Sequence, residues 1–218
     1  RINDFCFEKC NKLNKVEITT ESSLEIIGQY SFSKSSIPNI TLPNSVKYIE
    51  QYSFYECQNL KSVTFSSSSQ LKTISRYAFF KTCIQSINFP NNLENIEDFA
   101  FNECTNLRLL NFIPESKLQT IGCNTFQSTF IVEIKIPSSV RVIKNNAFYQ
   151  CKSLEIVEFL SNSRLEVIEE NAFSNSSIKK INIAPSVKII KKNVFNGCQN
   201  LEIVEFLSNS RLEVIEEN

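Results

Sequence analysis

The residue types that carry most enzyme chemistry are poorly represented in this sequence. It has no histidine, so Ser–His, Cys–His and histidine–metal arrangements are all excluded within the chain. Its three glycines are scattered and form no phosphate-binding loop. Paired carboxylates such as Glu169 and Glu170 could transfer protons, but adjacent acids on an exposed turn are more often solvated charge. We therefore expect no catalytic site, no cofactor and no bound metal.

The eight cysteines are the remaining candidates for chemistry. Five of them lie 47 residues apart, each three residues after a phenylalanine: Cys10, Cys57, Cys104, Cys151 and Cys198. A disulfide needs Cα atoms within about 7 Å of each other, and a metal site needs several ligands close together. The chemistry of this column therefore depends on the repeated elements that position it.

Phenylalanine gives the period of those elements. Successive anchor phenylalanines lie 25 and 22 residues apart in strict alternation. The anchors are Phe7, Phe32, Phe54, Phe79, Phe101, Phe126, Phe148, Phe173 and Phe195. Two repeat types thus add up to a 47-residue super-repeat, and Leu154–Asn171 recurs letter for letter at Leu201–Asn218. This identity begins abruptly, which indicates recent duplication of a coding segment and presents one surface twice.

Each repeat predicts one strand and one tight turn. In L-x-x-V-x-F the last apolar residues alternate with polar ones, as Val63 and Phe65 do, and this period of two is typical of a strand. Nine such segments run from Leu13–Ile18 to Leu201–Phe206. The following L-x-x-I-x-x-x-x-F spacing favours a short helical or 3₁₀ turn. Repeats of this size bury their apolar face only by stacking. We therefore expect a single α/β solenoid over residues 1–218.

The expected solenoid has about nine coils, a parallel sheet on its concave face and helical or 3₁₀ turns on its convex side. Cysteines of the column are then two coils, or roughly 10 Å, apart, which is too far for a disulfide. We interpret them as small buried thiols that fill a corner of each coil. Cys83, one coil from both Cys57 and Cys104, is the only candidate disulfide partner for the column.

The motif L-x-x-V-x-F/I-P-x-S-V-x-x-I-x-x-x-A-F-x-x-C resembles the BspA-like, or treponemal-type, leucine-rich repeat. The segment Ile134–Phe159 matches it almost position for position, and copies extend through the whole chain. The resemblance implies a surface-displayed or secreted protein of anaerobic bacteria or parasitic protists. It also implies adhesion to host matrix proteins, other microbes or host receptors, and it supplies no catalytic residues. The chain departs from the family pattern because only Gly28 and Gly122 follow the turn isoleucine.

The outward positions of the strands form the candidate partner-binding surface. With the first leucine of L-x-x-V-x-F as position one, positions three and five point away from the core. Most are polar, but Leu109, Ile156 and Ile203 recur at intervals of 47 residues and predict an apolar stripe. The candidate partner-binding residues are Leu109, Asn111, Lys135, Ile156, Glu158, Asn182, Ile203 and Glu205. The alternative interpretation is that these apolar chains tuck under their neighbours and were copied without selection.

Charge alternates along the chain as well. The coil between Phe173 and Phe195 has five lysines and no acid, whereas the coils on either side are acidic. Opposite charges on neighbouring coils favour one register of the stack. A lysine patch for glycans or anionic partners is the alternative interpretation. The formal net charge of zero argues against a nucleic-acid partner, and no apolar run is long enough to cross a bilayer.

These observations together favour a non-enzymatic protein-binding module. We expect a cell-surface or secreted adhesin-like region that engages a host matrix protein, a neighbouring-cell protein or another subunit, without direct membrane contact from this segment. The alternative is an intracellular architectural protein built into a larger assembly. Both ends fall inside a repeat and lack a polar-faced cap, so we also expect flanking repeats, caps or a dimer partner.

Overall fold

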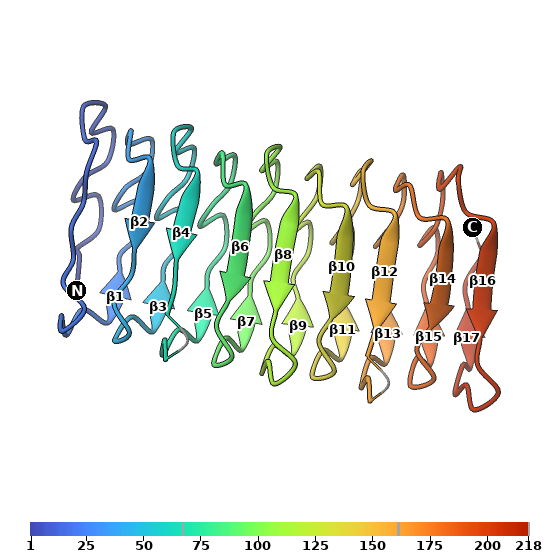
Figure 1. The fold of residues 1–218 in the computed structure, drawn as a ribbon. Helices are drawn as coiled ribbons and strands as arrows, with labels where there is room; N and C mark the ends of the chain where they lie inside the picture. Colours follow the sequence, from blue (N-terminus) through green and yellow to red (C-terminus); the bar gives the residue numbers. More distant parts are fainter. Residues whose placement is uncertain (67, 161, 218) are drawn as a thin grey trace.

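The computed structural model describes residues 1–66, 68–160 and 162–217 as one elongated stack of coils (Figure 1). Two rows of parallel strands run along the stack, and the chain termini lie at its opposite ends (Figure 1). Apolar side chains fill the space between the two rows, so each coil buries its apolar residues against the coils beside it. The structure is a parallel solenoid, as the repeats predicted, with about eight turns instead of the nine coils expected.

The longer strands form one row and coincide with L-x-x-V-x-F. They are β2 (Asn39–Thr41), β4 (Ser62–Thr64), β6 (Ser86–Phe89), β8 (Leu109–Phe112), β10 (Glu133–Ile136), β12 (Ile156–Phe159), β14 (Lys180–Ile183) and β16 (Ile203–Phe206). β2 pairs with β4, and the remaining six form one parallel sheet in chain order.

The ninth expected long strand, over Leu13–Ile18, is not formed in the described residues. In later coils the residue at position two donates its backbone N–H to the preceding coil, as Lys61 does to the Pro38 oxygen at 2.8 Å. In the coil that follows Leu13–Ile18, position two is Pro38 itself, which has no N–H to donate. The first backbone hydrogen bond between these two coils is therefore missing, and the segment Leu13–Ile18 is not paired as a strand.

The second row consists of two-residue strands. They are β1 (Ile26–Ile27), β3 (Tyr48–Ile49), β5 (Thr73–Ile74), β7 (Asn95–Ile96), β9 (Thr120–Ile121), β11 (Val142–Ile143), β13 (Val167–Ile168), β15 (Ile189–Ile190) and β17 (Val214–Ile215). Together they form a nine-stranded parallel sheet in chain order. They occupy the start of the segments for which the sequence predicted helical or 3₁₀ turns.

That helical prediction is wrong, because the described residues contain no helix, and therefore none that could cross a membrane. Each anchor phenylalanine is bracketed by two residues with positive φ, such as Tyr52 (59°) and Glu56 (52°) around Phe54. A left-handed residue ends a right-handed helix. The backbone N–H groups of Phe54 and Glu56 donate instead to the next coil, to the oxygens of Ala78 and Phe80, both at 2.8 Å. The turns are thus a third hydrogen-bonded column between coils.

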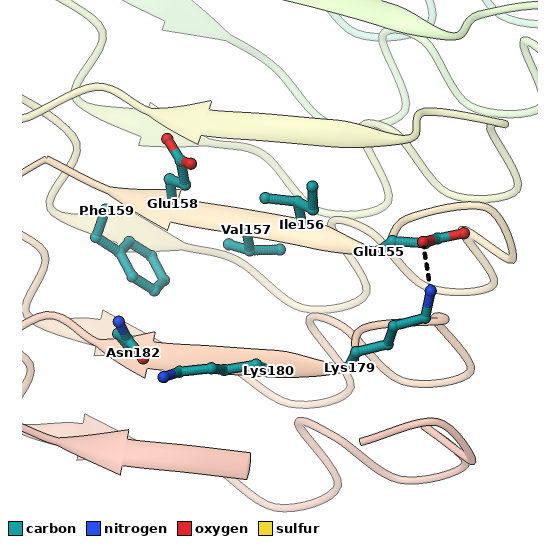
Figure 2. A pocket seen from close by; sticks show the side chains of 8 residues that line it. All are labelled: Glu155, Ile156, Val157, Glu158, Phe159, Lys179, Lys180 and Asn182. Atoms are coloured by element: carbon teal, nitrogen blue, oxygen red, sulfur yellow. Dashed lines mark hydrogen bonds and ion pairs between the residues drawn. The ribbon is translucent and has the colours of Figure 1, made fainter. Parts of the chain in front are cut away.

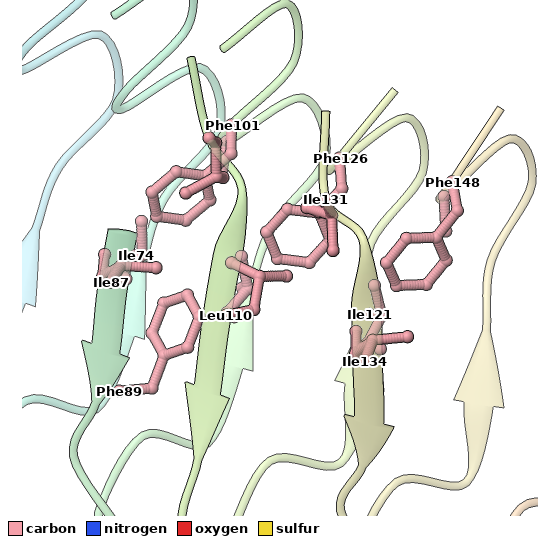
Figure 3. Packing of buried hydrophobic residues seen from close by; sticks show 14 of the residues in the cluster. Ile74, Ile87, Phe89, Phe101, Leu110, Ile121, Phe126, Ile131, Ile134 and Phe148 are labelled. Carbon is pink, nitrogen blue, oxygen red and sulfur yellow. The ribbon is translucent and has the colours of Figure 1, made fainter. Parts of the chain in front are cut away.

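The anchor phenylalanines form a continuous stack through the core. Neighbouring rings lie 5.0 to 6.0 Å apart between centroids from Phe7 to Phe195. Figure 3 shows Phe101, Phe126 and Phe148 of successive coils packed beside isoleucines from both rows of strands. All anchors from Phe32 to Phe173 are fully buried. The period read from phenylalanine is therefore the stacking period of the solenoid.

Candidate protein-binding surface

The outward side chains of β8, β10, β12, β14 and β16 form one continuous surface, here called the outer face. Position four of each motif is directed into the core, as for Val157, which is 5% exposed, and positions three and five therefore point outward. The eight candidate residues all lie on this face and are exposed to solvent: Leu109, Asn111, Lys135, Ile156, Glu158, Asn182, Ile203 and Glu205. Their exposure follows from strand alternation, and their role in binding stays a prediction.

The apolar residues of the outer face are separated by charged ones. Strand register places Glu133 between Leu109 and Ile156, and Lys180 between Ile156 and Ile203. Neighbouring apolar side chains are therefore two strands, or roughly 10 Å, apart. The row at position three alternates apolar and charged side chains, instead of forming the continuous stripe that the sequence suggested.

These apolar side chains are not tucked under their neighbours. Leu109 is 50% exposed, Ile156 45% and Ile203 44%. The alternative interpretation of concealed side chains therefore does not hold. Each one stands as an isolated apolar contact point in a polar surface.

Polar residues of the outer face are linked from coil to coil. Asn111 Nδ2 donates to Asn88 Oδ1 at 2.7 Å. Lys135 Nζ lies 3.1 Å from a carboxylate oxygen of Glu158, and Lys180 Nζ lies 3.0 Å from one of Glu205. These contacts connect polar side chains of neighbouring strands around the exposed apolar ones.

The lysines of the basic coil pair with acids on the adjacent coils. The pairs are Lys179–Glu155 (2.8 Å), Lys180–Glu205 (3.0 Å), Lys188–Glu166 (3.0 Å), Lys191–Glu216 (2.6 Å) and Lys192–Glu170 (3.4 Å). All five lysines of this coil are thus engaged within the molecule. This geometry agrees with charge alternation as a register device, because a slip by one coil would oppose like charges.

A shallow hollow of about 640 Å³ lies between β12 and β14 on the outer face. Figure 2 shows the ion pair of Glu155 with Lys179 at one end and the side chains of Phe159 and Asn182 at the other. Its lining residues are Glu155, Ile156, Val157, Glu158, Phe159, Lys179, Lys180 and Asn182. The hollow combines one exposed apolar side chain with paired charges, which suits contact with another protein.

Sequence reasoning missed Glu155 and Lys179 as parts of this site. They occupy position two of the motif, which precedes the strand, so the alternation rule does not place them. The available signal was opposite charge at the same motif position in adjacent coils. The hydrogen bond from Lys179 to Glu155 raises the pKa of the lysine, because the carboxylate favours the charged form of the ammonium group.

The cysteine column is buried from Cys57 to Cys198, as the sequence indicated, whereas Cys10 in the first coil is only half-buried. Cys57 Sγ donates to the Phe32 oxygen at 2.9 Å, and Cys104 Sγ donates to the Phe79 oxygen at 3.0 Å. Burial raises the pKa of Cys57 to about 11 and that of Cys104 to about 12. The thiolate, which is the reactive form, is therefore strongly disfavoured. None of the eight cysteines forms a disulfide in the described residues, including Cys83.

Comparison with known proteins identifies the repeat. The model of the BspA type leucine-rich repeat region matches residues 1–108 and 72–202, with six copies. A leucine-rich repeat protein from Bacteroides ovatus is 23% identical, with a TM-score of 0.58 over 99% of this chain and 66% of that chain. The T. pallidum leucine-rich repeat protein is 24% identical, with a TM-score of 0.57 over 77% of this chain and 66% of that chain.

A third solved structure is that of a leucine rich cell surface protein from Faecalibacterium prausnitzii. It is 21% identical, with a TM-score of 0.47 over the whole of this chain and 76% of that chain. None of the curated proteins is significantly similar in sequence. The chain spans just under two thirds of the length of the Bacteroides and T. pallidum proteins, and at these identities the likeness shows the fold alone.

Proposed function

Because the chain belongs to the BspA-type leucine-rich repeat family, we propose that it is a non-enzymatic, adhesin-like binding module displayed at the cell surface. Its partner is a protein of a host or of a neighbouring cell. Families of this fold serve in general as scaffolds for protein interaction, since stacked coils create one extended surface. The outer face is the part of that surface that recognises the partner.

The observation that carries this proposal is the uncovered pattern of the outer face. Leu109, Ile156 and Ile203 are half exposed, and charged or amide side chains held by cross-coil contacts surround them. Protein interfaces have the same composition, with apolar contacts that become buried and a polar rim around them. The 47-residue period repeats this pattern along the solenoid, which favours a partner that offers several contact points.

The second candidate function is an architectural role inside a larger assembly. One observation favours it: the charges of the basic coil are paired within the molecule, as Lys188 is with Glu166 at 3.0 Å, so these charges hold neighbouring coils together as in a rigid scaffold.

The test is saturable binding to a panel of immobilised matrix and cell-surface proteins. Ile156→Asp with Ile203→Asp places two charges at the apolar contact points, and we expect at least a tenfold loss of affinity, or about 1.4 kcal/mol or more. Asn39→Asp with Ser86→Asp is the matched control, since it adds two charges at position three of strands β2 and β6, also two strands apart. Circular dichroism confirms that both variants fold.

Binding that survives in the Ile156 and Ile203 variant would place recognition elsewhere on the solenoid. Absence of binding to every protein of the panel would favour the architectural function, and localisation of the intact protein would then decide between the two.

A further inference from the structure

The outer face is complementary to itself. We propose that two copies of this chain bind face to face, about a two-fold axis that runs along β12. This inference names the partner of the proposed binding surface, as a second copy on a neighbouring cell, and so it rests on the proposed function.

The symmetry operation follows from the parallel strands. A two-fold axis along the strand direction keeps that direction and reverses the order of the coils. β8 then lies opposite β16 of the second copy, β10 opposite β14, and β12 opposite its own equivalent. The two solenoids run antiparallel, which suits copies that meet from opposing surfaces.

The row at position three becomes complementary under this operation. In the order from β8 to β16 it reads Leu109, Glu133, Ile156, Lys180 and Ile203. Leu109 therefore meets Ile203 of the second copy, and Ile156 meets its own equivalent. Glu133 meets Lys180 of the second copy. Each unlike pair occurs twice because the interface is isologous, so five strands supply three apolar contacts and two ion pairs.

Residues that flank this row continue the match. At position two, Arg108 meets Glu202 of the second copy, and both are exposed, whereas Glu155 meets its own equivalent and is paired with Lys179 of its own chain at 2.8 Å. Just beyond the strands, Ile113 meets Leu207 of the second copy, and these are 38% and 48% exposed. At position five, Glu158 meets its own equivalent, which is a like-charge contact. Each Glu158 is neutralised by Lys135 of its own chain at 3.1 Å, so this contact opposes association only weakly.

The groups required for the new ion pair are available. Glu133 has no hydrogen bond or ion pair with any side chain among the described residues. Lys180 lies 3.0 Å from Glu205 of its own chain, but an ammonium group carries three N–H donors and can bind a second carboxylate. Association therefore gives Glu133 a partner without removing one from Glu205.

The size of the interface predicts its strength. Five strands about 4.8 Å apart and four residues of about 3.3 Å each define a patch of about 300 Å², and flanking residues bring it to about 400 Å² per copy. The total of about 800 Å² lies below the range of stable complexes, about 1,200 to 2,000 Å². We expect a dissociation constant in the micromolar to millimolar range. Such weak binding holds two surfaces together only when many copies on each surface bind at once.

Charge reversal tests the inference by sedimentation equilibrium up to about 1 mM protein. Lys180→Glu sets Glu133 against a glutamate in both pairs, and Glu133→Lys sets two lysines against each other, so each variant should self-associate at least tenfold more weakly. An equimolar mixture of the two variants restores opposite charge in both pairs of the heterodimer. The mixture should therefore associate at least as tightly as the wild type. The double variant, which carries both Lys180→Glu and Glu133→Lys in one chain, should have a dissociation constant within about threefold of the wild-type value.

Lys72→Glu is the matched control, because it makes the same change of charge beside β5, in the other row of strands, and should leave association unchanged. A wild type that stays monomeric up to about 1 mM would overturn the inference. So would a mixture that does not recover, or a Lys72→Glu effect equal to that of Lys180→Glu.

The proposed function fails separately. If self-association is absent but a foreign protein binds and is lost with Ile156→Asp and Ile203→Asp, the inference of a second copy is overturned and the outer face keeps its function. If self-association follows the charge pattern, the inference holds whether or not the panel contains a foreign partner.

Discussion

In the turns of the first five coils, a column of aromatic residues combines an unfavourable backbone conformation with favourable ring stacking. The two contributions to stability can be compared in magnitude. Two positions before the anchor phenylalanine, the first five coils carry Phe5, Tyr30, Tyr52, Tyr77 and Phe99, all with positive φ. An aromatic residue is disfavoured in this left-handed region. The later coils carry asparagine at the same position, which adopts the region more readily. Replacement of Tyr52 by asparagine therefore relieves backbone strain but removes aromatic contacts.

The contacts outweigh the strain. The Tyr52 ring stacks on Tyr30 at 4.6 Å and on Tyr77 at 5.0 Å, and it meets Tyr55 edge-on at 5.5 Å between centroids. Three such contacts at about 0.5 to 1.5 kcal/mol each contribute about 1.5 to 4.5 kcal/mol. Relief of the left-handed conformation returns about 1 kcal/mol. Tyr52→Asn should thus lower the free energy of unfolding by about 2 kcal/mol.

Urea denaturation followed by far-ultraviolet circular dichroism measures this change. Tyr52→Phe is the control, because it keeps all three ring contacts and should change the free energy by less than about 0.5 kcal/mol. Solenoids can unfold in segments, so the first transition of the N-terminal coils is the quantity to compare. A Tyr52→Asn variant as stable as the wild type, or more stable, would refute the reasoning, because backbone strain would then exceed stacking.

Three further predictions concern burial and charge. Cys104, with a pKa raised to about 12 by burial, should resist iodoacetamide at pH 8 in the native protein while exposed Cys6 is alkylated; equal labelling in peptide mass spectra would contradict this. Phe126→Ala should lower the free energy of unfolding by about 3 to 5 kcal/mol in urea titrations, and a loss below about 1 kcal/mol would contradict full burial. The hydrogen bond from Lys188 lowers the pKa of Glu166 below its ordinary 4.5, so this pair stabilises the fold above that pH and ceases to do so as pH falls through the lower folded value. Lys188→Gln should therefore lose less stability than the wild type on acidification, and identical acid transitions would contradict the pairing.

Stacking made the core predictable from sequence. Every coil must bury the same face against its neighbours, so the anchor phenylalanines and residues such as Val63 recur at fixed positions. The long strands follow from the same constraint, since their period of two is visible within each repeat. The eight candidate residues of the outer face are exposed for this reason too, because they alternate with buried ones.

The turns were not predictable from apolar spacing. Four residues separate the turn isoleucine from the anchor phenylalanine in each coil, which is close to one helical turn, but the backbone there bonds to the next coil. Ile49 forms a strand pair with Ile74, and Tyr52 then turns the chain in the left-handed region. The spacing of apolar residues predicts neither the acceptor of a backbone N–H nor the sign of φ. Aromatic residues are also uncommon at positive φ, so their presence gave no signal of a turn.

The order of side chains across the outer face required the strand register. Leu109, Ile156 and Ile203 belong to the longer repeat, whereas their neighbours on either side come from the shorter repeat. When position three is compared among the longer repeats alone, it predicts a continuous apolar stripe. When the shorter repeats are placed between them, it predicts the alternation of apolar and charged side chains that the structure has.

Duplication explains the repeated part of the outer face but not its complementarity. The copied segments Leu154–Asn171 and Leu201–Asn218 give two strands the same isoleucine and glutamate. Glu133 and Lys180 also lie 47 residues apart, at one position of the shorter repeat, yet they carry opposite charges. A faithful copy would have placed the same charge at both positions, and two copies about β12 would then repel each other there. The proposed pairing therefore depends on a position at which equivalent residues of the super-repeat differ in sign, and the mixing of Lys180→Glu with Glu133→Lys examines that position directly.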